Sequence, residues 1–285
     1  MNAASKTASR TVSWRRWLPR PLRSCWRRYF GRRVFQGDYP SWAAACAVAE
    51  GYDDPEKSAR IIGAAREVRA GRAAWDRDGM LFHEPQWHEP LVAALRRVAR
   101  AGGGVLEVVD FGGGLGSTWW QHRTALAEFR VSWRVIERAQ LVEAGQREFS
   151  DAVLTFHPTL AAAQEARPAQ VILLSSVLSY LEDPHALLRE VAAWGAPHVI
   201  VDRTPFVTGG RDRLAVQSAP SELGGGRYPC WLFDRAGVAA AFQAHYDLAG
   251  EWLVPFDQAD ENVPYHGLHF QRQADAPMPP ASQVP

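Results

Sequence analysis

Short apolar runs recur between residues 105 and 204, and most are followed by a segment of helical or alanine-rich character. These runs are candidates for buried strands: 105–111, 131–137, 152–156, 171–177 and 198–204. Helices are expected between them near 117–128, 139–149 and 184–193. Alternation of strand and helix is typical of a parallel sheet that is covered by helices on both faces.

Two more strand candidates, 246–254 and 265–273, follow this region. The ten residues between them, PFDQADENVP, suit a hairpin better than a helical crossover. The pattern therefore predicts an α/β fold with a Rossmann-like, doubly wound and mostly parallel sheet that ends in an antiparallel hairpin.

The segment before the first strand has a different pattern. Residues 34–103 carry alanine-rich helical stretches that are interrupted at Gly51 and Pro55, and a last helix ends in glycines near 102–104. We expect a helical cap there, joined to the sheet domain at 104–273. A basic arm at 1–33 precedes the cap, and a proline-rich tail without fixed structure is expected at 274–285.

The net charge of +1 conceals a strong asymmetry. Residues 1–33 hold ten of the 32 basic residues and no acidic one, so 22 basic residues face 31 acidic ones in the remainder. An acidic body argues against a broad nucleic-acid groove. The arm also interleaves Trp, Tyr and Phe with Arg. Contact with an anionic membrane surface and a solvated tail are both open interpretations, and RNA contact is a weaker third.

Cysteine and histidine spacing favours neither disulfides nor a metal site. Cys25, Cys46 and Cys230 are far apart and form no CxxC pair, which is typical of a reducing cytoplasm. His83 and His88 lack a nearby third ligand, so no metal is expected. Nothing in the pattern indicates an oligomeric state.

The stretch DFGGGLGST (110–118) follows a strand candidate and precedes a helix candidate, as a ligand-binding loop does. A Walker loop would need a lysine, which is absent. A dinucleotide loop of the form GxGxxG would place Ser117 at its third glycine. The pattern DxGxGxG of S-adenosylmethionine (SAM)-dependent methyltransferases fits without substitution, through Asp110, Gly112, Gly114 and Gly116.

The physical roles of this loop follow from its residue types. Glycines allow a tight backbone and close approach to a ligand. The helix that begins near Ser117 points N–H groups at the loop, where a methionine carboxylate could bind. Asp110 could receive the ammonium group directly or through water, and Phe111 lies beside it. Glu137, at the end of the next strand candidate, could accept both ribose hydroxyls, as acids do in NAD sites too.

The fourth strand candidate ends in Ser175 and Ser176, which we expect at the carboxyl edge of the sheet beside the donor. Beyond these motifs, the chain resembles a bacterial family of SAM-dependent methyltransferases that are often encoded near cell-surface glycan genes. The similar segments span 35–272: FQGDYPSW, EGYDD, WDRDG, DFGGGLGSTWWQHR, SSVLSYLEDP, DRTPF, DRLAVQ, YPCWLF and GLHF. The resemblance implies SAM as the cofactor and a small-molecule or glycan-related acceptor.

Candidate acceptor residues come from the helix after the glycine loop, from the ends of the fourth and fifth strand candidates, and from the segment before the last helix. Asp202 and His122 are candidate general bases for the removal of a hydroxyl proton. Contacts with the acceptor are expected from four further residues: Tyr180, Arg203, Tyr228 and Trp231.

O-methylation is the leading interpretation, on the strength of the resemblance. N-methylation is the alternative within the enzyme class, and a catalytically silent SAM-binding or scaffold protein is an alternative outside it. An NAD-dependent oxidoreductase is disfavoured by the missing third glycine and the terminal hairpin. We expect a cytoplasmic protein whose arm could touch the inner membrane face.

Overall fold

The computed structural model describes residues 34–49, 55–165, 167–219, 225–255, 257 and 263–276. The basic arm, the EGYDD segment and most of the proline-rich tail lie outside these residues. No helix in the described ranges has both the length and the apolar character needed to cross a membrane.

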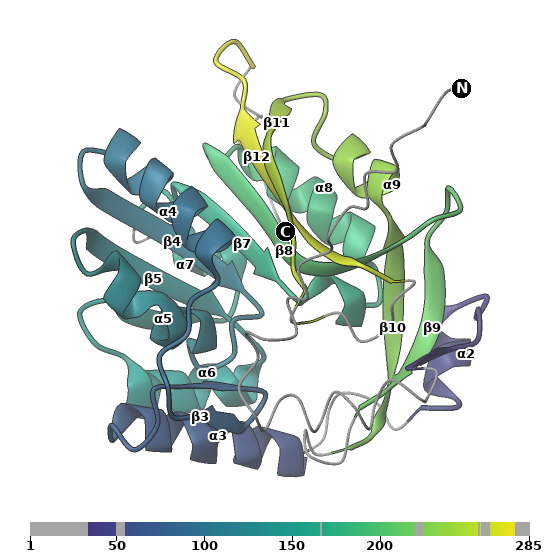
Figure 1. Ribbon diagram of the computed structural model, residues 1–285, viewed down its shortest axis with the longest axis horizontal. Helices are drawn as coiled ribbons and strands as arrows, with labels where there is room; N and C mark the ends of the chain where they lie inside the picture. The colour runs from purple at the N-terminus through teal and green to yellow at the C-terminus, as the bar shows by residue number, and fades with distance from the viewer. Residues whose placement is uncertain are drawn as a thin grey trace, which may run out of the picture.

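A parallel sheet forms the centre of the molecule (Figure 1). Its strands run in the order β6, β5, β4, β7, β8, with every neighbouring pair parallel. Their bounds are β4 Val105–Phe111, β5 Arg130–Ile136, β6 Leu154–His157, β7 Val171–Ser175 and β8 His198–Val207. β12 (Tyr265–Arg272) adds antiparallel to β8, and β11 (Tyr246–Leu253) adds antiparallel to β12. The predicted fold class is confirmed.

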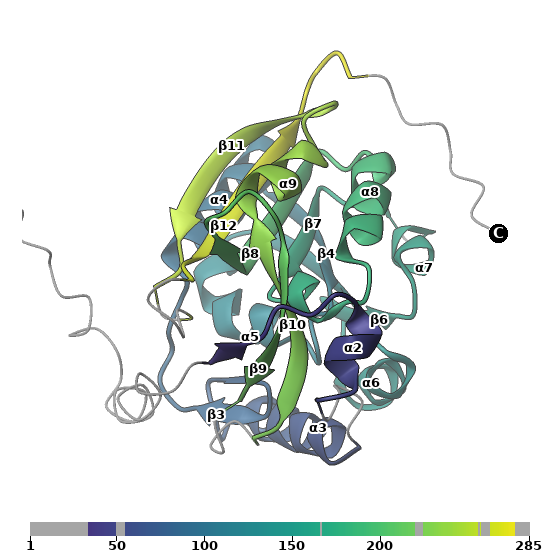
Figure 2. The same cartoon turned by 90° about the vertical axis from the view of Figure 1, so that its right-hand side faces the viewer.

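The strands are apolar on both sides because helices cover both faces. Successive residues of β7 separate accordingly: Val171 and Leu173 belong to one core cluster, while Ile172 and Leu174 belong to the other. Figure 2 shows the two helical layers on opposite sides of the sheet. The first core includes α3 Pro55–Arg69, α4 Glu89–Ala101 and α6 Ala139–Ala144, with α5 Ser117–His122 beside it. The second includes α7 Leu160–Glu165, α8 Pro184–Trp194 and α9 Arg235–Ala240.

Two strands that the sequence pattern did not predict are inserted between β8 and α9. They are β9 (Arg213–Ser218) and β10 (Arg227–Asp234), which pair antiparallel. β1 (Phe35–Gln36) pairs with β9, and α2 (Trp42–Cys46) packs against β9 and β10. The end of β10 runs parallel to the end of β8. The N-terminal segment is thereby joined to the insertion.

The segment 34–103 contains a hairpin as well as helices. β2 (Trp75–Arg77) and β3 (Met80–Phe82) are joined by Asp78 and Gly79, whose φ angles are +51° and +82°. A two-residue Asp-Gly connection with positive φ at both positions is the type I′ turn that matches the twist of a hairpin. Trp75 stacks on Phe82 at 3.8 Å between ring centroids. The Asp-Gly pair was a sequence signal for this hairpin.

Two predicted helices are shorter than expected. α5 ends at His122 and continues as a 3₁₀ turn over Arg123–Leu126, and α6 ends in a π turn over Gly145–Phe149.

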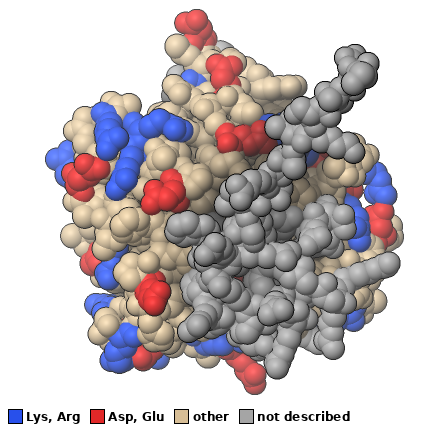
Figure 3. Space-filling view, viewed as in Figure 1, with Lys and Arg blue, Asp and Glu red and all other residues tan. Residues whose placement is uncertain are grey.

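On the face seen in Figure 3, acidic and basic side chains are interspersed, with a larger basic group over α4.

Candidate functional site

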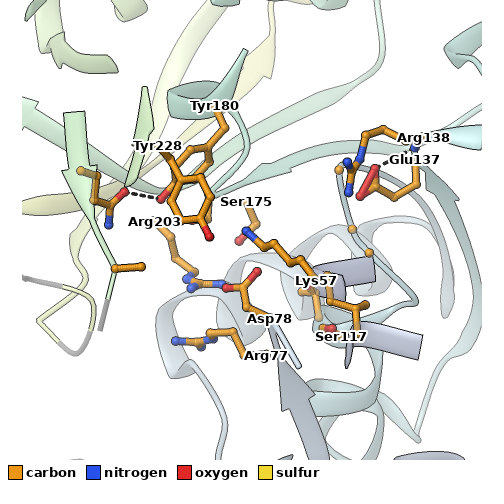
Figure 4. A pocket seen from close by; sticks show the side chains of 18 residues that line it. Lys57, Arg77, Asp78, Ser117, Glu137, Arg138, Ser175, Tyr180, Arg203 and Tyr228 are labelled. Carbon is orange, nitrogen blue, oxygen red and sulfur yellow. Dashed lines mark hydrogen bonds between the residues drawn. The ribbon is translucent and has the colours of Figure 1, made fainter. Parts of the chain in front are cut away.

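A cavity opens at the carboxyl edge of the parallel sheet (Figure 4). Its floor comes from the segments that follow β4, β5 and β7: Gly112–Gly114, Glu137–Arg138 and Ser175–Ser176. The strand order reverses between β4 and β7, and open α/β sheets bind ligands at that point. The first turn of α5 adds Ser117 and Thr118 to the same wall.

The glycine loop folds closely over its own acid. A Cβ atom on Gly113 would lie 2.6 Å from Oδ2 of Asp110, so this position, for which the motif assigned no role, accepts no side chain. Gly114 has φ +61°, and only Ser117 Oγ, at 3.8 Å, lies near the place of its Cβ. The loop therefore packs against Asp110 at Gly113 and leaves open space at Gly114, which lines the cavity.

Asp110 is 1% exposed and lies beneath the loop instead of lining the cavity. Its Oδ2 accepts a hydrogen bond from Trp133 Nε1 at 3.0 Å, while Oδ1 makes no hydrogen bond of normal geometry with the described residues. Burial raises the pKa of this carboxyl to about 7, against the opposing effect of the Trp133 N–H group. The expected direct contact with an ammonium group is therefore not evident in the cavity wall.

Glu137 lines the cavity at the end of β5, beside the glycine loop (Figure 4). Its Oε2 accepts a hydrogen bond from the backbone N–H of Arg138 at 2.8 Å. Gly116 caps α5 and Phe111 packs against the core, and neither residue lines the cavity. Of the residues expected to bind the donor, five line the cavity: Gly112, Gly114, Glu137, Ser175 and Ser176. The other three, Asp110, Phe111 and Gly116, lie outside its wall.

Backbone strain is concentrated around this cavity. Among the described residues, positive φ occurs outside glycine at Asp78 (51°), Ser176 (60°) and Arg203 (53°), and all three line the cavity. Such conformations are costly and are retained where the surrounding structure enforces them, often at ligand sites. They come from three segments that are far apart in sequence. The type I′ turn accounts for the positive φ of Asp78, whereas the positive φ of Ser176 and Arg203 supports this cavity as the candidate site independently of the glycine motif.

His122 does not reach the cavity. It is 2% exposed, and its Nε2 accepts a hydrogen bond from the backbone N–H of His88 at 3.1 Å. Nδ1 therefore carries the proton and donates it to the carbonyl of Thr118 at 2.7 Å. Burial lowers the pKa of the imidazole to about 4. Both ring nitrogens are engaged, so the structure does not support His122 as a general base.

Asp202 is also withdrawn from the cavity, because it is fully buried in β8. Its Oδ1 accepts a hydrogen bond from Trp252 Nε1 at 2.9 Å, and its Oδ2 faces Ser175 Oγ at 3.5 Å and His88 Nδ1 at 3.4 Å. The carboxylate stands behind Ser175 and orients it. The structure does not support Asp202 as a base that touches the acceptor.

Three of the four expected acceptor residues, Tyr180, Arg203 and Tyr228, line the cavity. Tyr180 donates a hydrogen bond to Gln217 Oε1 at 2.7 Å, and Tyr228 donates one to the carbonyl of Gly225 at 2.9 Å. Trp231 does not line the cavity and packs among core side chains instead. It is three residues after Tyr228 in β10, so the two side chains point to opposite faces of the strand.

The sequence analysis missed several residues of the wall, among them four with polar or charged side chains: Lys57, Arg77, Asp78 and Gln217. Lys57 is 6% exposed, and its Nζ lies 4.5 Å from the ring centroid of Tyr228. This contact joins α3 to the inserted strand β10 across the cavity. The Asp-Gly turn was a signal for Asp78, but no local pattern distinguishes Lys57 from the other basic residues of α3.

Among the described residues, no group of three or more His, Cys, Asp or Glu side chains could hold a metal ion. His83 Nδ1 lies 3.0 Å from the carbonyl of Arg72, whereas His88 is buried near Asp202.

No protein-family model and no curated protein matches the chain. Among solved structures, the N-terminal domain of EvdMO1, in the presence of SAH and D-fucose, has a TM-score of 0.45 and 15% identity over 78% of this chain and 98% of its own. Magnesium protoporphyrin IX methyltransferase (ChlM) from Synechocystis PCC 6803 with bound SAH also has a TM-score of 0.45 and 15% identity, over 76% and 94%. 1,6-Didemethyltoxoflavin-N1-methyltransferase from Burkholderia thailandensis has a TM-score of 0.43 and 16% identity, over 79% of this chain and 95% of its own. Similarity at this level does not identify the ligand of this chain, and the residues of the cavity are the evidence for it.

Proposed function

We propose that the chain is a SAM-dependent methyltransferase that methylates a hydroxyl group of a small, glycan-related acceptor. One observation carries the proposal. A positive-φ glycine loop between β4 and α5 and an acid at the end of β5 line one cavity, at the point where the strand order reverses.

The residues of the wall fit SAM better than a dinucleotide. Glu137 would accept the ribose hydroxyls, and the loop at Gly112–Gly114 would support the amino-acid end. The carboxylate of Asp78 lies in the same cavity as the loop, where it would favour a sulfonium or an ammonium group. The antiparallel pair β11–β12 also departs from an all-parallel dinucleotide domain.

SAM supplies a methyl group on a positively charged sulfur, so the leaving group needs no acid. The task of the chain is then to align the acceptor and exclude water, and positioning of this kind can supply about 7–11 kcal/mol of the barrier. Tyr180, Tyr228 and Lys57 lie in the part of the wall that belongs to neither the glycine loop nor Glu137. We propose that they define the acceptor end.

The acceptor end of the cavity is formed by segments outside the central parallel strands. Lys57 comes from α3, while Gln217 and Tyr228 come from β9 and β10. We propose that the N-terminal segment 34–103 and the insertion act together as a cap, within a chain whose sheet domain spans 104–273. The tyrosine hydroxyls and the Gln217 amide suit a polar acceptor, and the resemblance noted above supports a glycan-related one.

We further propose a cytoplasmic protein whose arm at 1–33 contacts the anionic inner face of the membrane, supported by its ten basic residues and absence of acidic ones.

Calorimetric titration with SAM, S-adenosylhomocysteine (SAH) and NAD tests the donor. Binding of SAM and SAH without NAD is expected, and tight NAD binding or no SAM binding contradicts the proposal. Incubation with methyl-labelled SAM and a whole lysate, whose glycan fraction is then analysed separately, tests the reaction. Label on a hydroxyl oxygen supports O-methylation, label on nitrogen supports the N-methyl alternative, and no label on any cellular acceptor supports a silent SAM-binding protein.

A further inference from the structure

Three charged side chains form a wall of the cavity that the glycine motif does not account for (Figure 4). Arg77 ends β2, Asp78 begins the turn after it, and Arg203 comes from β8. Figure 4 shows the carboxylate of Asp78 directed toward the guanidinium of Arg203. The type I′ turn fixes the position of Asp78, and Arg203 has a positive φ of 53°, an unfavourable conformation for this residue type that the surrounding structure enforces where it delivers the charge.

The two guanidiniums are held in place by a shared carboxylate. Arg77 Nη1 lies 2.9 Å from Asp257 Oδ1, and Arg203 forms an ion pair with the same carboxylate through Nε and Nη2. Their side chains are 18% and 17% exposed. Arg77 also lies 5.2 Å from the centroid of the Trp75 ring. An arginine has five N–H donors, so Arg203 can bind Asp257 along one edge and present another to a ligand.

The charges of this wall are nearly balanced. Asp257 and Asp78 oppose Arg77 and Arg203. The buried Asp202 carboxylate adds a negative charge near both guanidiniums, and Lys57 adds a positive charge to the cavity wall. A ligand with a single charge would leave one sign of this arrangement uncompensated in a partly buried site. A ligand that carries an ammonium and a carboxylate on one carbon matches both signs.

We propose that Arg77, Asp78 and Arg203 form a clamp for the α-amino-acid end of the methyl donor and its product. The guanidiniums receive the α-carboxylate and Asp78 receives the α-ammonium. This inference rests on the proposed function. It places the amino-acid end against the β2–β3 hairpin and leaves Asp110 as the support of the glycine loop.

The test compares two ligands that differ in the amino-acid end. SAH carries it, whereas 5′-methylthioadenosine keeps the adenosine and the thioether but lacks it. Asp78→Asn removes the charge and preserves the turn, because Asn-Gly is also a preferred type I′ pair. Arg77→Met removes the guanidinium, and Asp257 keeps Arg203 as its partner. Arg189→Met, at a 68% exposed side chain on α8 away from the cavity, is the matched control.

Calorimetry on the full chain gives the result. Loss of a charge-assisted hydrogen bond should weaken SAH binding about 10- to 100-fold in Asp78→Asn and Arg77→Met. 5′-Methylthioadenosine affinity should stay within about twofold of wild type in both, as should SAH affinity in Arg189→Met. Melting temperatures are measured in parallel, and if Arg77→Met unfolds, the Asp78→Asn result decides.

Failure of the clamp differs from failure of the proposed function. If wild type binds neither ligand, the proposed function is wrong. If wild type binds SAH but the variants leave its affinity unchanged, or weaken both ligands equally, the clamp is wrong and the donor site remains.

Discussion

The buried carboxyl of Asp110 makes stability depend on pH in a direction that can be measured. Burial raises its pKa from 3.8 to about 7, a gap of about 3 units. In the unfolded chain this group loses its proton near pH 4, whereas in the folded chain it holds the proton until about pH 7. Its contribution therefore destabilises the fold progressively as the pH rises through this window.

The size of the effect follows from the gap. At 1.36 kcal/mol per unit, the raised pKa of Asp110 costs the fold about 4 kcal/mol at pH 8, where the group is ionised. At pH 5, where the folded chain keeps the group protonated, the cost is about 1–2 kcal/mol. Asp110→Asn removes the charge and keeps an oxygen for the Trp133 N–H group. The free energy of unfolding of the variant minus that of wild type should therefore increase by about 2–3 kcal/mol between pH 5 and pH 8.

Urea unfolding of both proteins at pH 5, 6, 7 and 8 measures this difference. The change with pH is the decisive quantity, because any packing cost of the substitution is constant across the series. Asp38→Asn is the flat control: a hydrogen bond from Arg211 lowers the pKa of Asp38, so this carboxyl is ionised in both the folded and the unfolded chain from pH 5 to pH 8, and its difference should not change over the series. A difference for Asp110→Asn that is flat or falls with pH would refute the burial argument and indicate a compensating partner for this carboxylate.

Three other outcomes are expected. Gly114→Arg should abolish SAH binding, because the new side chain would occupy the open space of the cavity beside Gly114. The positive φ at this position should cost only about 1–2 kcal/mol of stability. Retained SAH affinity in calorimetry would mean that the loop does not hold this ligand. His122→Phe should lower the free energy of unfolding by about 1–3 kcal/mol through the unpaired His88 N–H and Thr118 carbonyl groups, with SAH affinity unchanged; unaltered stability in urea would contradict the bridging role. Deletion of 1–33 should reduce partitioning onto phosphatidylserine vesicles in sedimentation assays, and equal partitioning would leave the arm as a solvated tail.

The sheet and the glycine loop were predictable because their signals are local. Apolar runs of strand length separated by helical segments predict a parallel sheet, and parallel strands gather their carboxyl ends at one edge. That geometry is sufficient to bring Glu137 and Ser175 to the same cavity as the loop. The β2–β3 hairpin also had a local signal in Asp78-Gly79, which the alanine-rich surroundings obscured.

Burial and long-range pairing were not readable in this way. His122 and Asp202 have the chemistry of a general base, but one bridges two backbone segments and the other accepts a hydrogen bond from Trp252, 50 residues away. Tyr228 and Trp231 looked equivalent until the register of β10 assigned them to opposite faces. Whether a polar side chain meets a ligand or a neighbour depends on contacts between distant segments.

The amino-acid sequence by itself therefore determined the α/β class, the position of the loop and the edge of the sheet where a ligand binds, because these follow from periodicity and from backbone freedom at glycine. Only the tertiary structure showed that Lys57, Arg77 and Asp78 join Glu137 and Arg203 at the cavity. Lys57, Arg77, Asp78 and Arg203 arrive from three separate segments, and their positions are set by the packing of α3, the β2–β3 hairpin and β8 around the site. Local periodicity contains no information about that packing, since it arises from burial and charge pairing across the whole chain.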